Sequence, residues 1–255
     1  MQQILYNIYH KYWKKWGCFG DYPDWASAAA ECSGYDAQAI FEKVRQATLQ
    51  VKNGEAAYER DSVLFYEAKI QKHLIDKLEF VKNTEGGVRV LDFGGALGST
   101  YFQHQKLLKE VPNLIWCVIE QPHFVECGKK EFEDEILKFE PTIEAAIAKY
   151  QPNFVLFSSV LQYLEHPYAV LKTVFDANMP YVYIDRTPFL PQKEDRIVQQ
   201  ITHPKVYEAS YPCWLFSKEK MVNYLCLRGN NAVDNHLNSD LNNIRDCKYE
   251  GFFIN

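Results

Sequence analysis

One stretch decides how this chain is interpreted: Val90-Leu91-Asp92-Phe93-Gly94-Gly95-Ala96-Leu97-Gly98-Ser99. Its apolar beginning predicts a buried strand that ends at Asp92, and the glycines predict a tight turn that opens a helix. Such a turn aims backbone N–H groups and a helix N-terminus at whatever lies in the crevice beyond the strand. The stretch therefore predicts a strand–loop–helix unit that binds a ligand.

The order of residues in this loop indicates the charge of its ligand. It differs from the G-x-G-x-x-G pattern of dinucleotide-binding loops, and a phosphate-binding Walker loop needs a lysine where Ser99 stands. The acid Asp92 precedes the glycines instead, which suits a ligand with a positive amino group. S-adenosylmethionine, with its α-ammonium and sulfonium, has this charge pattern. We expect Asp92 to hold the ammonium, and Gly94, Gly95 and Gly98 to let the backbone approach the cofactor.

A second acid stands 22 residues after Gly98, where the apolar run 114–119 ends in Glu120. A carboxylate at the tip of a second strand accepts hydrogen bonds from both hydroxyls of an adenosine ribose. The spacing fits one helix and two turns. We expect Glu120 and the adjacent Gln121 to bind the cofactor. The simpler alternative is a turn that only packs, with Glu120 a solvated strand end.

The 255 residues fit one domain with an appendage better than two full domains. After Gly87, short apolar runs alternate with amphipathic stretches, which predicts an open, mostly parallel α/β sheet with helices on both faces. The tail, 231–254, predicts a closing antiparallel pair. We expect an N-terminal helical arm and cap over residues 1–85 and a cofactor-binding domain over residues 86–255.

Expectations for the remaining segments are more local. In the cap, Asp24 predicts the start of a short helix, Asp36 the start of a second, and Ser62 the start of a third. The stretch 186–216 shows no clear periodicity and is expected to be a long loop, a type of segment that is usually functional or contains a short element.

Composition excludes several classes of protein. With 47% hydrophobic and 24% charged residues, the chain is expected to be globular rather than disordered. A net charge of −5 argues against nucleic-acid binding. The seven scattered cysteines indicate neither a disulfide framework nor a zinc site, and no metal is expected. No signal peptide and no apolar run of about 20 residues is recognised, so we expect a cytoplasmic protein without a transmembrane segment.

The loop from Asp92 to Gly98, followed by Glu120, resembles the cofactor loop of class I S-adenosylmethionine-dependent methyltransferases. Ala96 stands where the commonest D-x-G-x-G-x-G form has its middle glycine, and Gly95 compensates. The chain from about Gly17 onward also resembles a family of bacterial methyltransferases, assigned from sequence, that are found with surface-polysaccharide genes. The runs that carry this resemblance are 54–62, 91–101, 120–128, 158–164, 184–189 and 207–214. It implies a Rossmann-like class I sheet whose last strand is antiparallel beside the fifth.

Methyl transfer requires alignment of the acceptor and exclusion of water, and it requires a base when the acceptor is an alcohol. The candidates for that base lie in segments expected at the carboxyl edge of the sheet: His123, Asp185 and His203. Each histidine also fits a surface or hydrogen-bonded loop residue, and Asp185 also fits an acid that only pairs with Arg186.

Other side chains are candidates for lining the pocket. Ser158 and Gln162, at the end of the fourth strand, are expected to donate to the cofactor. Arg186 suits bidentate binding of a phosphate or carboxylate, with a structural ion pair as the alternative. Further substrate-binding candidates come from the cap and from the long loop: Tyr58, Arg60, Tyr207 and Tyr211. For these residues, a solvated helix cap and an apolar cluster under the loop are the alternatives.

Taken together, the residues and the resemblance predict a methyltransferase that uses S-adenosylmethionine to methylate an oxygen, or as a second choice a nitrogen. The expected partner is a small anionic or sugar-linked molecule in surface-polysaccharide assembly, and the oligomeric state stays open. Two alternatives remain: an NAD-dependent oxidoreductase on a related sheet, and a non-catalytic binding module with a methyltransferase-like fold.

Overall fold

The computed structural model describes residues 16–33, 37–203, 206, 208–228, 233–240 and 242–255, and the fold is α/β as predicted. Five parallel strands form its centre in the order β6-β5-β4-β7-β8. Their bounds are β4 (Arg89–Phe93), β5 (Ile115–Ile119), β6 (Leu137–Glu140), β7 (Phe154–Ser158) and β8 (Tyr181–Leu190). The chain runs from β4 to β5 and β6 on one side and returns to β7 and β8 on the other. The reversal therefore falls between β4 and β7, the point where ligands bind in such sheets.

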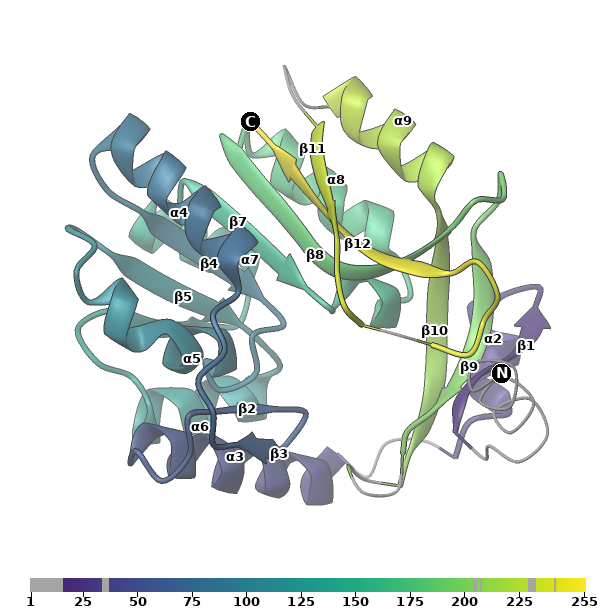
Figure 1. Ribbon diagram of the computed structural model, residues 1–255, viewed down its shortest axis with the longest axis horizontal. Helices are drawn as coiled ribbons and strands as arrows, with labels where there is room; N and C mark the ends of the chain where they lie inside the picture. Colours follow the sequence, from purple (N-terminus) through teal and green to yellow (C-terminus); the bar gives the residue numbers. More distant parts are fainter. Residues whose placement is uncertain (1–15, 34–36, 204–205, 207, 229–232, 241) are drawn as a thin grey trace.

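The C-terminal strands complete the sheet as the resemblance implies. β12 (Lys248–Ile254) is antiparallel to β8, the fifth parallel strand, and β11 (Val233–Leu237) is antiparallel to β12. Figure 1 shows these two strands beside β8. This arrangement confirms the predicted closing antiparallel pair.

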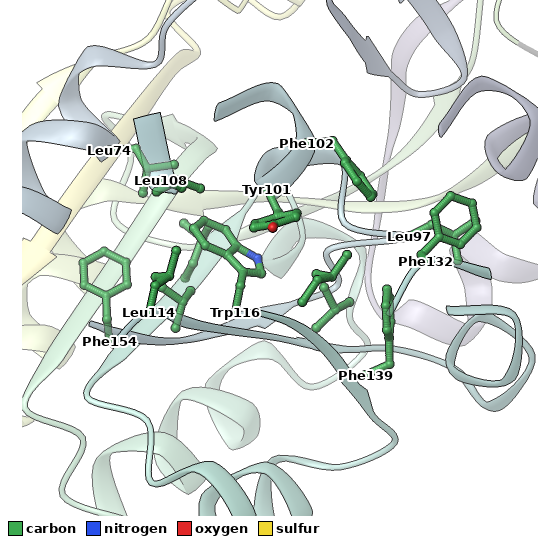
Figure 2. Packing of buried hydrophobic residues seen from close by; sticks show 14 of the residues in the cluster. Leu74, Leu97, Tyr101, Phe102, Leu108, Leu114, Trp116, Phe132, Phe139 and Phe154 are labelled. Carbon is green, nitrogen blue, oxygen red and sulfur yellow. The ribbon is translucent and has the colours of Figure 1, made fainter. Parts of the chain in front are cut away.

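Helices cover both faces of the sheet because successive strand residues point to opposite sides. Val90 packs in the hydrophobic cluster that includes α4 and α5, whereas its neighbour Leu91 packs with α7, α8 and α9. Figure 2 shows the first cluster, where Trp116 of β5 lies close to Tyr101 of α5. The bounds of the helices are α4 (Lys72–Glu85), α5 (Ser99–Leu108), α6 (Pro122–Glu131), α7 (Ile143–Tyr150), α8 (Pro167–Asp176) and α9 (Lys218–Arg228).

The N-terminal part is only partly helical, which corrects the sequence-based expectation. Asp24 caps α2 (Trp25–Ala30) as predicted, and α3 (Ala37–Lys52) follows, whereas Asp36 lies outside the described residues. Before these helices, β1 (Gly17–Tyr22) pairs with β9 (Arg196–Ile201) and so belongs to the main sheet.

The third predicted helix is wrong at its start. Residues 58–65 form a hairpin of β2 (Tyr58–Arg60) and β3 (Val63–Phe65), and α4 begins only at Lys72. The physical reason lies in the turn, where Asp61 and Ser62 have φ of 51° and 65°. Two consecutive left-handed residues make a two-residue hairpin turn, whose twist matches that of the flanking strands.

The expected long loop at 186–216 is instead mostly strand. β8 extends to Leu190, and β9 (Arg196–Ile201) and β10 (Ser210–Ser217) form an antiparallel hairpin. Figure 1 shows β1, β9 and β10 together at the right of the view, away from β4 and β5 at the left. The hairpin buries alternate residues such as Cys213 and Leu215. Within the described residues, no helix has the length and apolar character needed to cross a membrane.

Candidate cofactor and acceptor site

A cavity of about 1520 Å³ opens at the carboxyl edge of the central strands. One side is formed by the segments that follow β4 and β5, and the other by the end of β7, by Arg186 of β8 and by the β9–β10 hairpin. The predicted site residues that line it are Asp92, Gly94, Gly95, Glu120, Gln121, His123, Ser158, Arg60, Arg186, His203 and Tyr211. The structure therefore brings together side chains that are spread over about 150 positions of sequence.

The glycine loop is held tightly against its surroundings. Gly94 has φ of 72°, a left-handed conformation that favours glycine, and its N–H donates to the Ile119 carbonyl at 2.9 Å. A Cβ on Gly95 would lie 2.5 Å from the Asp92 carboxylate. Gly98 also has positive φ, and a Cβ there would lie 3.0 Å from a Leu137 methyl group, so it shapes the turn and does not line the cavity.

Asp92, at the end of β4, is 1% exposed. One of its carboxylate oxygens, Oδ2, accepts a hydrogen bond from the Trp116 indole at 2.9 Å. Burial raises the pKa of Asp92 to about 7, although the Trp116 hydrogen bond opposes this shift. Asp92 is therefore a carboxyl that is costly to ionise until a cation approaches it.

Glu120 connects the two segments that follow β4 and β5. Its Oε1 accepts the Ala96 N–H at 3.2 Å, and its Oε2 accepts the Gln121 N–H at 2.9 Å. Burial raises the pKa of Glu120, and the two backbone hydrogen bonds only partly offset that effect. Because a carboxylate offers about four lone-pair sites, both oxygens retain capacity for further donors such as ribose hydroxyls.

Glu59 is a site residue that sequence reasoning missed. It lies in β2, is 4% exposed, and accepts hydrogen bonds from the Ser99 hydroxyl and, at 3.1 Å, from the Ser62 N–H. Burial raises the pKa of Glu59 to about 7 against these hydrogen bonds. Its one sequence signal is its position between Tyr58 and Arg60, which are predicted from sequence as substrate-binding candidates of the cap.

Three carboxyls thus surround the glycine loop: Asp92 and Glu59, which are buried, and Glu120, which is partly buried. In the described part of the chain, none of the three forms an ion pair with a basic side chain. Buried acids are normally paired, and unpaired ones take up protons or await a cationic ligand. The arrangement suits a positively charged ligand and disfavours a pyrophosphate.

The predicted residues at the end of β7 have different positions. Ser158 lines the cavity, together with its neighbour Ser159. Gln162 is fully buried and donates to the Ser159 hydroxyl at 3.0 Å, while its Oε1 has no hydrogen-bond partner among the described residues. Gln162 therefore supports the cavity wall through Ser159, and direct cofactor binding by Gln162 stays a prediction.

The three candidate bases are not equivalent. His123, in α6, lines the cavity on the β5 side, and His203 lines it near the β9–β10 hairpin. Asp185 is held outside the cavity, where its Oδ1 accepts from Asn238 at 2.9 Å and lies 3.2 Å from His236 Nε2. Burial acts to raise the pKa of Asp185, but the contacts with His236 and Asn238 lower it by more. The pKa of Asp185 therefore lies below its usual value.

Only some of the predicted substrate-binding residues line the cavity. Arg60, Arg186 and Tyr211 line the cavity. Tyr58 is buried outside it, where its ring stacks on Phe65 with centroids 4.6 Å apart. Tyr207 lies outside the described residues.

Neither a family model nor a curated protein sequence matches this chain. Among solved structures, the N-terminal domain of EvdMO1 in the presence of SAH and D-fucose is similar, with 13% identity, a TM-score of 0.54, and coverage of 86% of this chain and 97% of that one. The same domain with SAH bound has 13% identity, the same coverage and a TM-score of 0.52.

A third similar structure is 1,6-didemethyltoxoflavin-N1-methyltransferase of Burkholderia thailandensis, at 12% identity, a TM-score of 0.44, and coverage of 93% of this chain and 98% of that one. At such low identity, the two EvdMO1 matches show a shared fold. Together with the strand order, they confirm the Rossmann-like α/β sheet that the sequence predicts.

Proposed function

We propose that this protein is a methyltransferase that transfers the methyl group of S-adenosylmethionine to an oxygen of a small anionic or sugar-linked acceptor, with nitrogen as the alternative atom. The observation that carries the proposal is the group of three carboxyls around the glycine loop, two buried and one partly buried, that form no ion pair within the described residues. A cofactor with an ammonium and a sulfonium supplies the positive charge that these acids lack.

The bound cofactor supplies a methyl group already activated by its sulfonium, so the protein's main task is positioning. Glu120 would bind the ribose hydroxyls and Gln121 the adjoining nucleoside. Asp92 and Glu59 would face the cationic part, and Gly94 and Gly95 keep the loop backbone close to it. Ser158 would contribute a hydroxyl at the boundary between the cofactor half and the acceptor half of the cavity.

We assign the acceptor to the side of the cavity formed by β8, β9 and β10. Tyr211 contributes an aromatic wall, and its hydroxyl accepts from Thr202 at 3.3 Å. His203 adjoins Thr202 and lines the same side, so it is the base we propose for an alcohol acceptor. His123 lies on the cofactor side, and Asp185 is engaged by His236 and Asn238, which makes both weaker candidates.

The similar EvdMO1 domain supports the proposal, because it was crystallised with SAH and D-fucose, a cofactor product and a sugar. The role in surface-polysaccharide biosynthesis rests on the sequence resemblance. A cytoplasmic location, the absence of nucleic-acid partners, a possible homo-oligomeric state and the division of the chain at residue 85 are further parts of this proposal.

The two alternatives predict different ligands. An NAD-dependent oxidoreductase would place a doubly negative pyrophosphate beside the glycine loop, where three carboxyls oppose it. A non-catalytic module would show weak cofactor binding or none. A thermal-shift experiment with S-adenosylhomocysteine, S-adenosylmethionine and NAD separates these outcomes.

We expect both adenosyl compounds to stabilise the protein, by about 2.7 kcal/mol at a ligand concentration of about 100 times the Kd, and NAD to have no effect. Glu120→Ala should lose the shift, whereas Glu126→Ala, which removes an exposed carboxylate from the following helix, should keep it. Stabilisation by NAD alone, or by none of the three compounds, would contradict the proposal.

A further inference from the structure

Two arginines line the cavity and approach the same carboxylate, that of Asp240. Arg60 comes from β2 of the N-terminal hairpin, and Arg186 comes from β8 of the central sheet. They are close enough that the charge of Arg186 acts on Arg60, and both contact Asp240. Segments more than 120 residues apart in sequence thus bring two guanidinium groups to one wall.

Among the described residues, Arg60 makes fewer polar side-chain contacts than Arg186. Its side chain is 25% exposed, and its one ion-pair contact is the 4.0 Å approach of Nη1 to Asp240 Oδ1. As far as the structure describes the chain, this guanidinium donates no hydrogen bond. Burial, followed by the charge of Arg186, lowers the pKa of Arg60. A guanidinium has five N–H donors in a rigid fork, so Arg60 presents unused donors to the cavity.

Arg186 is held in a fixed position. Its Nη2 donates to Asp240 Oδ1 at 3.0 Å, and its Nε lies 3.3 Å from both oxygens of that carboxylate. Its backbone φ of 51° is in the left-handed region, which is uncommon for a residue with a side chain. Asp240 therefore orients Arg186 through Nε and Nη2, and among the described residues Nη1 of Arg186 donates no hydrogen bond.

The charged groups that act on the two arginines include the carboxylates of Asp61, Asp185 and Asp240. Asp61 acts on both arginines through its charge, and Asp185 acts on Arg186. Asp240 is committed to Arg186 by its hydrogen bonds, and Asp185 is committed to His236 and Asn238. In the part of the chain that the structure describes, neither carboxylate accepts a hydrogen bond from Arg60, so Arg60 keeps an open binding surface.

We propose that Arg60 and Arg186 form an oxyanion site that binds a phosphate or carboxylate group of the methyl acceptor. This inference rests on the methyltransferase function proposed above. Planar guanidinium forks match the two oxygens of such groups, and hydrogen bonds to charged partners are among the stronger ones in proteins. The acceptor is thus an anionic molecule, anchored through its charge.

The position of the pair fits this role. The glycine loop and Glu120 lie on the β4–β5 side of the reversal point, and Arg186 lies on the β8 side. Ser158 at the end of β7 is opposite Asp185 in register, one residue before Arg186. An anion bound by the two arginines would leave the space between it and the cofactor loop for the atom that receives the methyl group.

The test measures anion binding to the full-length protein saturated with S-adenosylhomocysteine. Calorimetric titrations use four probes: inorganic phosphate, glucose 1-phosphate, glucuronate and uncharged glucose. Arg60→Gln removes the unpaired guanidinium. Arg45→Gln is the matched control, because Arg45 pairs with Glu131 away from the cavity and undergoes the same change of charge.

We expect at least one of the three anions to bind saturably and glucose to bind more weakly. Arg60→Gln should weaken the binding of that anion about tenfold or more, whereas Arg45→Gln should leave it unchanged. Preference for glucose 1-phosphate or for glucuronate then distinguishes a phosphate from a carboxylate acceptor.

The result that would overturn the oxyanion site differs from the result that would overturn the proposed function. If S-adenosylhomocysteine binds but none of the anions binds saturably, or if Arg60→Gln and Arg45→Gln behave alike, the oxyanion site is wrong and the cofactor site stands. If S-adenosylhomocysteine itself does not bind, the proposed function is wrong and the oxyanion site loses its basis.

Discussion

At the scale of single residues, the site depends on acids that are buried before any cation is present. Asp92 and Glu59 each have a pKa raised to about 7, chiefly by burial. Without ligand, both are partly protonated at neutral pH. A cationic ligand favours their charged forms, so its binding should release protons and should strengthen as the pH rises.

Because of this linkage, we expect a rise in pH to lower the folding stability of the free protein and to strengthen ligand binding. Because the folded pKa of Asp92 lies above its unfolded value, the folded protein binds more protons than the unfolded chain between about pH 4 and pH 7. The contribution of Asp92 to stability is therefore present at low pH and is lost as the pH rises through 7, by at most about 1.4 kcal/mol per pH unit.

Binding of S-adenosylhomocysteine should instead tighten, by about tenfold for this one group, from pH 6 to pH 8. Unfolding in urea and calorimetric titration across this range measure the two effects. Asp92→Asn should flatten both pH profiles, and profiles identical to those of the wild-type protein would show that Asp92 does not carry the linkage.

The candidate cofactor residues can be proposed from sequence to the extent that one short stretch contains them. Asp92, Gly94 and Gly95 form one loop, and Glu120 follows at a spacing that a single helix determines, so local sequence was enough to propose them. Glu59 reaches the same loop from 40 positions before Ser99. No local pattern reveals such a long-range hydrogen bond.

At the scale of elements, the hairpin β2–β3 is the part that covers the cofactor loop. Glu59 of β2 accepts a hydrogen bond from Ser99 at the start of α5, which ties the hairpin to the glycine loop. The sequence predicted a helix beginning at Ser62, because an alternative with two left-handed residues, Asp61 and Ser62, cannot be recognised from residue types that also cap helices well.

Removing this tie should loosen the hairpin. Ser99→Ala leaves the buried Glu59 carboxyl with one fewer donor, which should raise its pKa further and cost about 1–3 kcal/mol of folding free energy. Hydrogen exchange should become faster in residues 58–65. Thr84→Ala, which removes an exposed hydroxyl bonded within α4, is the control and should change stability by no more than about 0.5 kcal/mol.

Equal stability of the two variants, with unchanged exchange in the hairpin, would show that the Glu59–Ser99 contact does not stabilise the hairpin.

The β9–β10 hairpin is a second element that the sequence did not predict. Its cavity-lining residues come in consecutive runs, Gln200 to Thr202 and Tyr211 to Pro212, and they mix polar, aliphatic and aromatic types. The period-2 pattern of a half-buried strand is therefore obscured where the strand also forms a binding wall.

At the scale of the whole molecule, the sheet divides the chemistry between two halves. The half that follows β4 and β5 is acidic and suits a cationic cofactor, whereas Arg60 and Arg186 add positive charge across the cavity. The class of fold followed from the alternation of strands and helices, but the second wall, made of β1, β9 and β10, did not. That wall joins segments from the two ends of the chain, and only the folded sheet shows their pairing.

The central claim is that a cationic adenosyl cofactor occupies the acidic half of this cavity. A crystal structure of the complex with S-adenosylhomocysteine tests it most directly. We predict density along the glycine loop, with the ribose hydroxyls on the Glu120 carboxylate and the ammonium facing Asp92 and Glu59. Density for the ligand elsewhere, or an empty loop at saturating ligand, would contradict the account.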